Sequence, residues 1–274
     1  MSPAQRRSLA AVSLAAAYIV TVYMLRFVVP LVTTGDPNAN QVKLSFLPPG
    51  ADPAFPLGTD QLGRDMLLRL LIGGSKSLEI SFVAVVISIA FGGTLGIVSA
   101  YLSGWFDIVA NRLSEIQFSF PAVLLGLVIL SLGGGGYWPI VLVIALAGWP
   151  MIFRLTRAAV LPLRNAQFIQ AAQIAGVPRG IIVVRHLLPP ALPVITTAGT
   201  IEFSRNLLLI ASLNYLGLGV QPPDADWSQM IAFGQAQLGT AWWIPALPAM
   251  ALITLVYAAN ALGDSLQGLL RVER

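Results

Sequence analysis

Gln170-Ala-Ala-Gln-Ile-Ala-Gly176, followed by Arg185-His-Leu-Leu-Pro189, forms a polar island between two long apolar segments. Hydrophobic residues make up 56% of the 274 residues, charged residues make up 10%, and the mean hydropathy is +0.78. A soluble domain carries about 25% charged residues. The composition therefore predicts an all-α polytopic membrane protein, and the island predicts a segment that this protein presents to another molecule in the cytoplasm.

The apolar segments are long enough for six membrane-spanning helices, since a bilayer core needs about 20 apolar residues per helix. The stretch from Ile116 to Phe153 has no charge, but it is too long for one crossing, and the glycine run 133–136 with Pro139 divides it. The expected spans are residues 9–31, 79–102, 116–132, 138–158, 191–215 and 242–262.

The distribution of Lys and Arg predicts the orientation, because cytoplasmic loops carry an excess of these residues. With the N-terminus inside, the outer segments contain only Lys43, Arg64, Arg69 and Lys76. The cytoplasmic segments then contain Arg6, Arg7, Arg112, Arg154, Arg157, Arg164, Arg179, Arg185, Arg271 and Arg274. We therefore expect both termini and the 159–190 loop in the cytoplasm.

Two weaker patterns concern the region before and within the second expected span. Residues 35–56 are rich in Pro, Asp and Asn and predict an irregular external loop. Thr59 or Asp60 is a candidate cap for a short amphipathic helix at the outer interface. Gly92 and Gly96 are spaced so that another helix can approach closely.

The chain lacks the residue patterns of an enzyme site. A phosphate-binding loop reads G-x-x-x-x-G-K-[ST], but Ser75 precedes Lys76 and Leu70 stands in place of the first glycine. There is no cysteine, and His186 is the only histidine, so no metal site is predicted. We expect no catalytic residue and no cofactor in this chain.

Glu202 and Arg205 are ionisable residues inside the fifth expected span. Their i,i+3 spacing lets them pair on one helix face. A pair that faces the bundle interior can line a polar pathway, as intramembrane charges often do. A pair that only neutralises itself is structural, and the sequence leaves both alternatives open.

The island has the pattern of a short helix. Residues 166–175 favour a local helix, and Gly176 followed by Pro178 predicts its end. The arginines that flank it are Arg157, Arg164, Arg179 and Arg185. Such a helix can dock into a groove of another protein, or it can only cap the bundle.

The island also carries a resemblance. Gln170-Ala-Ala-x-x-x-Gly176, with Leu188-Pro189 further on, resembles the EAA loop of type I ABC-importer permeases. Further motifs resemble the C-type permease subunit of dipeptide and oligopeptide importers, and they follow in the expected order from about residue 56 to 264. They are Pro56-Leu-Gly-Thr-Asp-Gln-Leu-Gly-Arg-Asp65, Gly148-Trp-Pro150, Arg185-His-Leu-Leu-Pro189, Leu216-Gly-Leu-Gly-Val-Gln-Pro222 with Trp227, and Leu262-Gly-Asp264.

This resemblance implies a complex of the chain with a second related permease, two ATP-hydrolysing subunits and an extracytoplasmic peptide-binding protein. ATP and Mg would be bound by the ATPase subunits, and the location would be the bacterial cytoplasmic membrane. Residues 1–75 would hold the first span, the external loop and the interfacial helix. Residues 76–274 would form the permease domain, with its coupling loop at about 159–190.

The same resemblance implies which residues meet the ATPase. Residues Gln170, Ala171, Ala172 and Gly176 would form the contact, with rim residues Arg179 and Arg185. Because Gln170 replaces the acidic residue of the EAA loop, the contact should depend on shape and small side chains. Ile210 also stands where an acidic residue is expected in this subgroup.

Two alternatives to a peptide permease stay open. A permease of the same build can move nickel or another metal complex, or haem. An ion-coupled secondary carrier working alone is a more distant alternative, since such a carrier has no need of a cytoplasmic docking helix.

Overall fold

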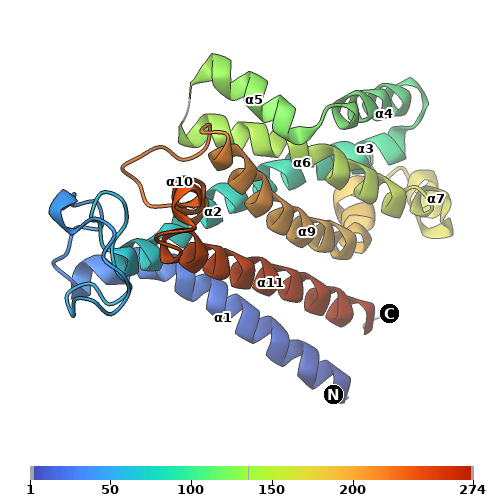
Figure 1. The fold of residues 1–274 in the computed structure, drawn as a ribbon. Helices are drawn as coiled ribbons and strands as arrows, with labels where there is room; N and C mark the ends of the chain where they lie inside the picture. Colours follow the sequence, from blue (N-terminus) through green and yellow to red (C-terminus); the bar gives the residue numbers. More distant parts are fainter. Residues whose placement is uncertain (1–2, 135, 273–274) are drawn as a thin grey trace.

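The computed structural model describes residues 3–134 and 136–272, and the regular structure in them is helical. The two longest helices, α1 and α11, pack together on one side of the bundle, and α4, α5 and α6 lie on the other side (Figure 1). The principal helices are α1 (Pro3–Val32), α2 (Met66–Ser88), α3 (Thr94–Leu102), α4 (Gly104–Ser119), α5 (Ala122–Gly133), α6 (Tyr137–Val160), α9 (Leu188–Tyr215) and α11 (Trp243–Val272).

Five helical segments of the described residues are long and apolar enough to cross a membrane, and there are six if the bent pair α4 and α5 forms one span. The six predicted spans are confirmed in this sense. The five are Leu9–Val32, Met66–Leu102, Tyr137–Asn165, Arg179–Tyr215 and Trp243–Leu266. The predicted division of the long apolar stretch is also found, because α5 ends at Gly133 and α6 begins at Tyr137.

The third span differs from the straight helix predicted at 116–132. It is a pair of helices bent by 85°, with the break between Ser119 and Ala122. Phe120 is extended, with φ −93° and ψ 123°, and Pro121 follows it. Proline disfavours the helical conformation of the residue before it, so the sequence did contain the signal for this bend.

The second span begins earlier than residue 79. The Asp65 side chain caps α2 by accepting hydrogen bonds from the amides of Leu67 (2.8 Å) and Leu68 (3.3 Å). From Met66 the helix continues through a π-helical turn (Ile89–Gly93) into α3. The separate interfacial helix expected after Thr59 or Asp60 is therefore wrong, since its apolar residues from Met66 onward belong to the first turns of α2.

The close helix approach predicted for Gly92 and Gly96 is confirmed. A Cβ atom on Gly92 would lie 2.4 Å from the carbonyl oxygen of Trp149, and one on Gly96 would lie 2.7 Å from that of Phe153. Both carbonyls belong to α6. The second span and α6 thus meet backbone to backbone, with no room for any side chain.

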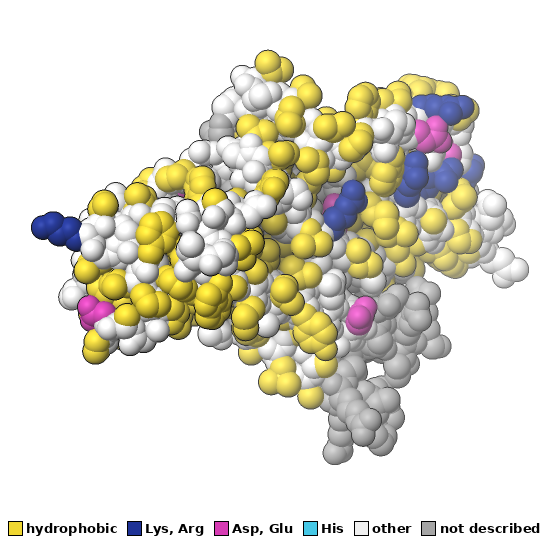
Figure 2. All heavy atoms as spheres, viewed as in Figure 1, with side chains coloured by type: hydrophobic (Ala, Val, Ile, Leu, Met, Phe, Trp, Pro, Cys, Tyr) yellow, Lys and Arg dark blue, Asp and Glu magenta, His cyan; other side chains and the backbone are white. Residues whose placement is uncertain are grey.

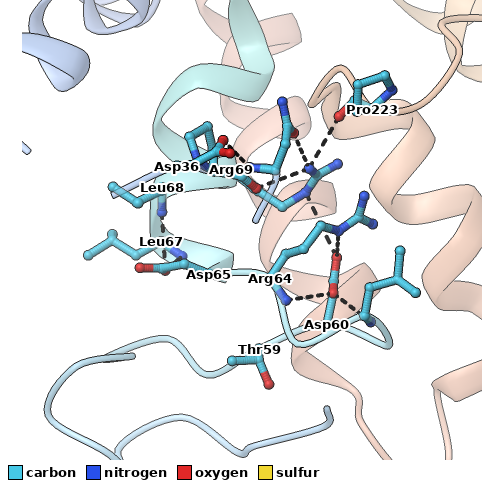
Figure 3. Close-up of polar contacts among 12 residues, drawn as sticks. Asp36, Thr59, Asp60, Arg64, Asp65, Leu67, Leu68, Arg69 and Pro223 are labelled. Carbon is cyan, nitrogen blue, oxygen red and sulfur yellow. Dashed lines mark hydrogen bonds and ion pairs between the residues drawn. The ribbon is translucent and has the colours of Figure 1, made fainter. Parts of the chain in front are cut away.

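Residues 56–65, which we call the clasp, form a compact turn at the end of the bundle opposite the chain termini (Figures 1 and 3). The Asp60 carboxylate accepts hydrogen bonds from the amides of Leu62 (2.8 Å) and Arg64 (3.0 Å) and from Arg64 Nε (2.6 Å). Trp243 Nε1 donates to the Thr59 carbonyl over 3.1 Å, which joins the clasp to the start of α11.

Arg69 extends this network to a second loop. Its side chain is 1% exposed, and Nη1 donates to Asn38 Oδ1 at 2.8 Å and to the Pro37 carbonyl at 3.3 Å. It also reaches the Pro223 carbonyl at 3.5 Å (Figure 3). From the sequence we expected Arg64 and Arg69 to be charges of an outer segment. In the structure both side chains are buried among the polar groups of this network.

Asp226 fixes the start of α10 (Trp227–Gly234) at the same end of the bundle. Its buried carboxylate accepts hydrogen bonds from Ser77 Oγ and Asn214 Nδ2 and from the amides of Ser228 and Gln229. Burial raises the pKa of this carboxyl, and the donors act in the opposite direction. Asp226 thereby ties α2, α9 and α10 together.

Candidate functional site

The island folds as a short two-faced helix, α7 (Gln167–Ile174). Ile169 is fully buried, and Ala172 packs against the same apolar cluster. Gln170, Ala171 and Ile174 lie on the opposite, exposed face. The helix is therefore held by one face and presents the other, at the end of the bundle where α1 begins and α11 ends (Figure 1).

Gly176 ends α7 as the sequence predicted. Its φ of +74° is favourable for glycine, and a Cβ atom there would meet nothing within 4 Å. The Gly176 amide donates to the Gln173 carbonyl, and the Val177 amide donates to the Ala172 carbonyl, each at 3.0 Å. This pair of bonds is a Schellman cap, which satisfies carbonyls that the last helical turn leaves free.

Buried side chains connect the loop around α7 to the membrane helices. After the cap come α8 (Arg179–Ile182), a π-helical turn (Val183–Leu187) and α9 without a break. Ile182 and Leu187 are fully buried in one cluster with Ile169, Ile97 of α3 and Val160 of α6. One apolar cluster therefore joins α7 to three membrane segments.

A cavity of about 540 Å³ lies beside α7, and it brings two of the predicted docking residues together. Gln170 and Arg179 line it, along with Arg164 and Gln173. Arg185 is exposed but lies outside this lining. Among the described residues, two guanidinium groups and no carboxylate line the cavity, so it suits an acidic side chain of a partner.

The structure also shows features of this surface that the sequence reasoning missed. Ile174 is 88% exposed on the same face as Gln170, although the reasoning emphasised the alanines. Arg157, counted among the flanking cations of the island, is not free, because Nε and Nη2 each bind the Asp107 carboxylate at 2.6 Å. The i,i+4 spacing of Gln170 and Ile174 was a visible signal for the first feature.

Figure 2 shows a mainly hydrophobic face of the molecule, on which Lys and Arg side chains gather around the ends of α4 and α7. Charges are sparse over the rest of this face, as expected for helices that meet lipid. Because charges are sparse on this face, the pair Glu202 and Arg205 stands out as the second candidate functional site.

Glu202 and Arg205 lie on α9 and form an ion pair with 3.6 Å between Oε2 and Nη1. The two side chains have different environments, since that of Glu202 is 2% exposed and that of Arg205 is 47% exposed. Glu202 therefore points into the bundle and Arg205 reaches out of it. The described residues contain no group of three or more His, Cys, Asp or Glu that could hold a metal ion.

Comparison with known proteins identifies the family. Residues 92–271 match the family described as "Binding-protein-dependent transport system inner membrane component". The chain belongs to this family. Its members are membrane components of ABC transporters in which partner subunits hydrolyse ATP, so the chain is a permease component and not an enzyme. Partner ATPase and binding-protein components follow from membership.

Several curated relatives cover most of this chain. A putative peptide transport system permease protein of Brucella suis is 34% identical and covers 92% of this chain and 84% of its own length. The dipeptide transport system permease protein DppC of Alkalihalophilus pseudofirmus is 31% identical, with 91% and 81% covered. The probable D,D-dipeptide transport system permease protein DdpC of Escherichia coli is 32% identical, with 93% and 85% covered.

Solved structures confirm the fold. The inward-facing MetNI methionine ABC transporter matches with a TM-score of 0.61 and 21% identity, over 73% of this chain and 94% of that one. An amino acid ABC transporter matches with a TM-score of 0.56 and 19% identity, over 73% and 92%. The chain therefore has the fold of type I ABC-importer permeases.

Proposed function

We propose that this chain is one permease subunit of an ATP-driven importer that moves dipeptides and oligopeptides across the bacterial cytoplasmic membrane. The observation that carries the proposal is α7, an exposed and end-capped helix that one apolar cluster joins to three membrane segments. The names of the relatives from three organisms support peptides as the cargo. A carrier working alone has no use for such a helix, and family membership removes that alternative.

The proposed assembly contains this chain, a second homologous permease, two ATP-binding subunits and an extracytoplasmic peptide-binding protein. Both termini lie in the cytoplasm in this proposal, on the side of α7, and the clasp faces the binding protein. Residues 1–75 supply the first span and the external loop, and residues 76–274 form the permease domain. The excess of arginine near α7 and both termini supports this orientation.

In the proposed contact, α7 docks into a groove of one ATPase subunit. Gln170, Ala171 and Ile174 meet the partner through the exposed face, and Ala172 and Gly176 shape the helix behind it. Small side chains let the partner approach the α7 backbone closely, and Ile174 supplies apolar area. The interaction then rests on shape and on apolar burial, since Gln170 carries no charge.

The charge-assisted part of the contact comes from the neighbouring arginines. Arg179 and Arg164 line the cavity beside Gln170, where an acidic side chain of the ATPase would find two guanidinium partners. Arg185 lies outside that cavity and contributes at the rim. Closure of the ATPase pair on ATP would move α7, and the cluster around Ile182 would pass that movement to α9.

Reconstitution tests the proposal directly. The chain is co-expressed with its permease, ATPase and binding-protein partners, and the complex is placed in proteoliposomes. ATP-dependent uptake of radiolabelled dipeptides and tripeptides is the expected result. Nickel complexes and haem serve as competing cargoes, and uptake of either in place of peptides would overturn the assignment. Purified chain alone should show no ATP hydrolysis.

A further inference from the structure

Arg205 is a cation on the exposed side of a membrane helix. Its neighbours along this side of α9, Ile201 and Leu208, are exposed apolar residues. At 1.5 Å per residue, Arg205 lies about 15 Å from the Tyr215 end of α9, well inside a hydrocarbon core about 30 Å thick. A guanidinium at that depth is unfavourable against lipid and normally faces protein, water or a pathway.

Glu202 is buried and lies close to α6. A Cβ atom on Gly148 would lie 2.8 Å from Glu202 Oε1, and the Ser88 hydroxyl would lie 2.9 Å from the same Cβ atom. The Glu202 carboxylate and the Ser88 hydroxyl of α2 thus both lie against α6 at Gly148. Its Oε2 atom has no hydrogen-bond partner within the described part of the chain and lies 3.6 Å from Arg205.

A cavity of about 140 Å³ lies beside Arg205, and residues of four helices, α4, α5, α6 and α9, line it. No acidic residue lines it, and Arg205 is the single charged residue of the described lining. The remaining lining residues are Gln117, Phe118, Phe120, Pro121, Ala122, Ala147 and Pro150. Arg205 has five N–H donors, and an ion pair at 3.6 Å with one buried carboxylate leaves most of them for another partner.

We propose that Arg205 is a binding point for the carboxylate group of the peptide during its passage, and that Glu202 is its positioning residue. The inference rests on the proposed peptide transport. Guanidinium and carboxylate form paired, charge-assisted hydrogen bonds. The cavity admits one such group and not a whole peptide, since pockets for entire ligands measure about 300–1,000 Å³.

The buried Glu202 gives the site a moderate affinity. Its negative charge lowers the net charge near Arg205 and therefore weakens the hold on a second carboxylate. Transport requires binding that is strong enough for entry and weak enough for release. If Arg205 instead formed a permanent ion pair with an acidic side chain of the second permease, its affinity would not need to be weakened by Glu202, because a static contact is not released during the cycle.

The first test measures the charge at the cavity. The chain contains no cysteine, so Phe120→Cys places one thiol in the lining. In the complete complex, the thiol reacts with an anionic and a cationic methanethiosulfonate of similar size, and labelling of this chain is followed by mass. The anionic-to-cationic rate ratio should fall about tenfold with Arg205→Gln and recover with Arg205→Lys. Leu132→Cys, which is more exposed at the end of α5, should show no change in ratio.

Two results of this test would overturn the proposal. An unchanged ratio in Arg205→Gln means that the charge of Arg205 does not act on the cavity. A Phe120→Cys thiol that reacts with neither reagent means that the second permease covers the cavity. The test compares the ratio of the two labelling rates. A change that alters the reactivity of the thiol toward both reagents equally therefore cancels.

The second test measures transport of trialanine by the complex in proteoliposomes. Arg205→Gln should lower uptake about tenfold while the subunit composition stays unchanged, and Arg205→Lys should restore part of the uptake. Glu202→Gln should lower both KM and kcat, because the carboxylate is then held longer. If Glu202 is merely structural, the same substitution should lower kcat without lowering KM.

The outcomes separate this inference from the proposed function. Normal uptake by Arg205→Gln, or loss of the second permease from that complex, overturns the role of Arg205 and leaves peptide transport intact. If the unsubstituted complex moves no peptide, the proposed function is overturned, and so is the proposal that Arg205 binds the carboxylate of a peptide. The labelling ratio then still shows whether Arg205 attracts anions.

Discussion

The end of α7 offers a sharp test of the docking helix, because Gly176 and Gly180 form a matched pair. A Cβ atom on either would meet nothing within 4 Å, but only Gly176 has a positive φ, at +74°. Gly176→Ala therefore introduces backbone strain and no clash, at a cost of about 1–2 kcal/mol for an L-residue in this region. Gly180→Ala carries the same change in unfolded-chain entropy without that strain.

A cost of 1–2 kcal/mol shifts the cap equilibrium by a factor of about 5–30. Hydrogen exchange of the amides of residues 176 and 177, which bond to the carbonyls of Gln173 and Ala172, should accelerate by that factor in Gly176→Ala and not in Gly180→Ala. ATP-driven uptake should fall in the first variant and stay normal in the second. Equal exchange rates in the two variants would refute the claim that the positive φ of Gly176 holds α7.

Three further substitutions probe the frame around the site. Gly92→Ala should destabilise the detergent-solubilised protein by about 1–3 kcal/mol through overpacking against α6, whereas Gly93→Ala, with no neighbour closer than 3.9 Å, should not. Asp107→Asn should cost about 2–3 kcal/mol by leaving a partly buried arginine unpaired, and Glu115→Gln in an exposed pair should cost about 0.5 kcal/mol or less. Asp226→Ala should cost about 2–5 kcal/mol, because its four donors lose their acceptor. Denaturant titration measures all three, and a loss in Gly93→Ala equal to that in Gly92→Ala would contradict the packing argument.

Local patterns predicted much of the fold. The number of spans followed from the length of apolar runs, the stop of α7 followed from Gly176, and the tight helix crossing followed from Gly92 and Gly96. These features depend on residues close together in the chain or on helix geometry alone. The bend at Pro121 belongs to the same class, and it was missed because the apolar run continues across it.

The clasp could not be predicted in the same way. Arg69 is buried because Asn38, Asp60 and the Pro223 carbonyl surround it, and these partners are up to 154 residues away in the sequence. A count of positive charges treats such an arginine as a loop cation. Only the fold reveals that it is a partner in a network.

The candidate site shows the same division between local and distant information. Sequence reasoning identified Gln170 and Arg179, and the fold places both on one cavity with Arg164. For Glu202 and Arg205, the i,i+3 spacing predicted that the two side chains can pair. It did not predict which of them faces the interior of the bundle. The asymmetry between a buried acid and a half-exposed base depends on Gly148, which lets the carboxylate sit against α6.

The two proposed functional regions are connected through α9. The cluster that anchors α7 includes Leu187, the residue before α9, and Arg205 lies on α9 itself. At 1.5 Å per residue, about 27 Å separate them along the helix axis. In the proposed cycle, a movement of α7 against the ATPase would pass along this helix toward Arg205. The cavity at Arg205 has its other walls on α6 and on the α4–α5 bend. A rotation of α9 would therefore change the distance between the guanidinium and those walls, and the proposed carboxylate would be released when the docking movement turns the helix.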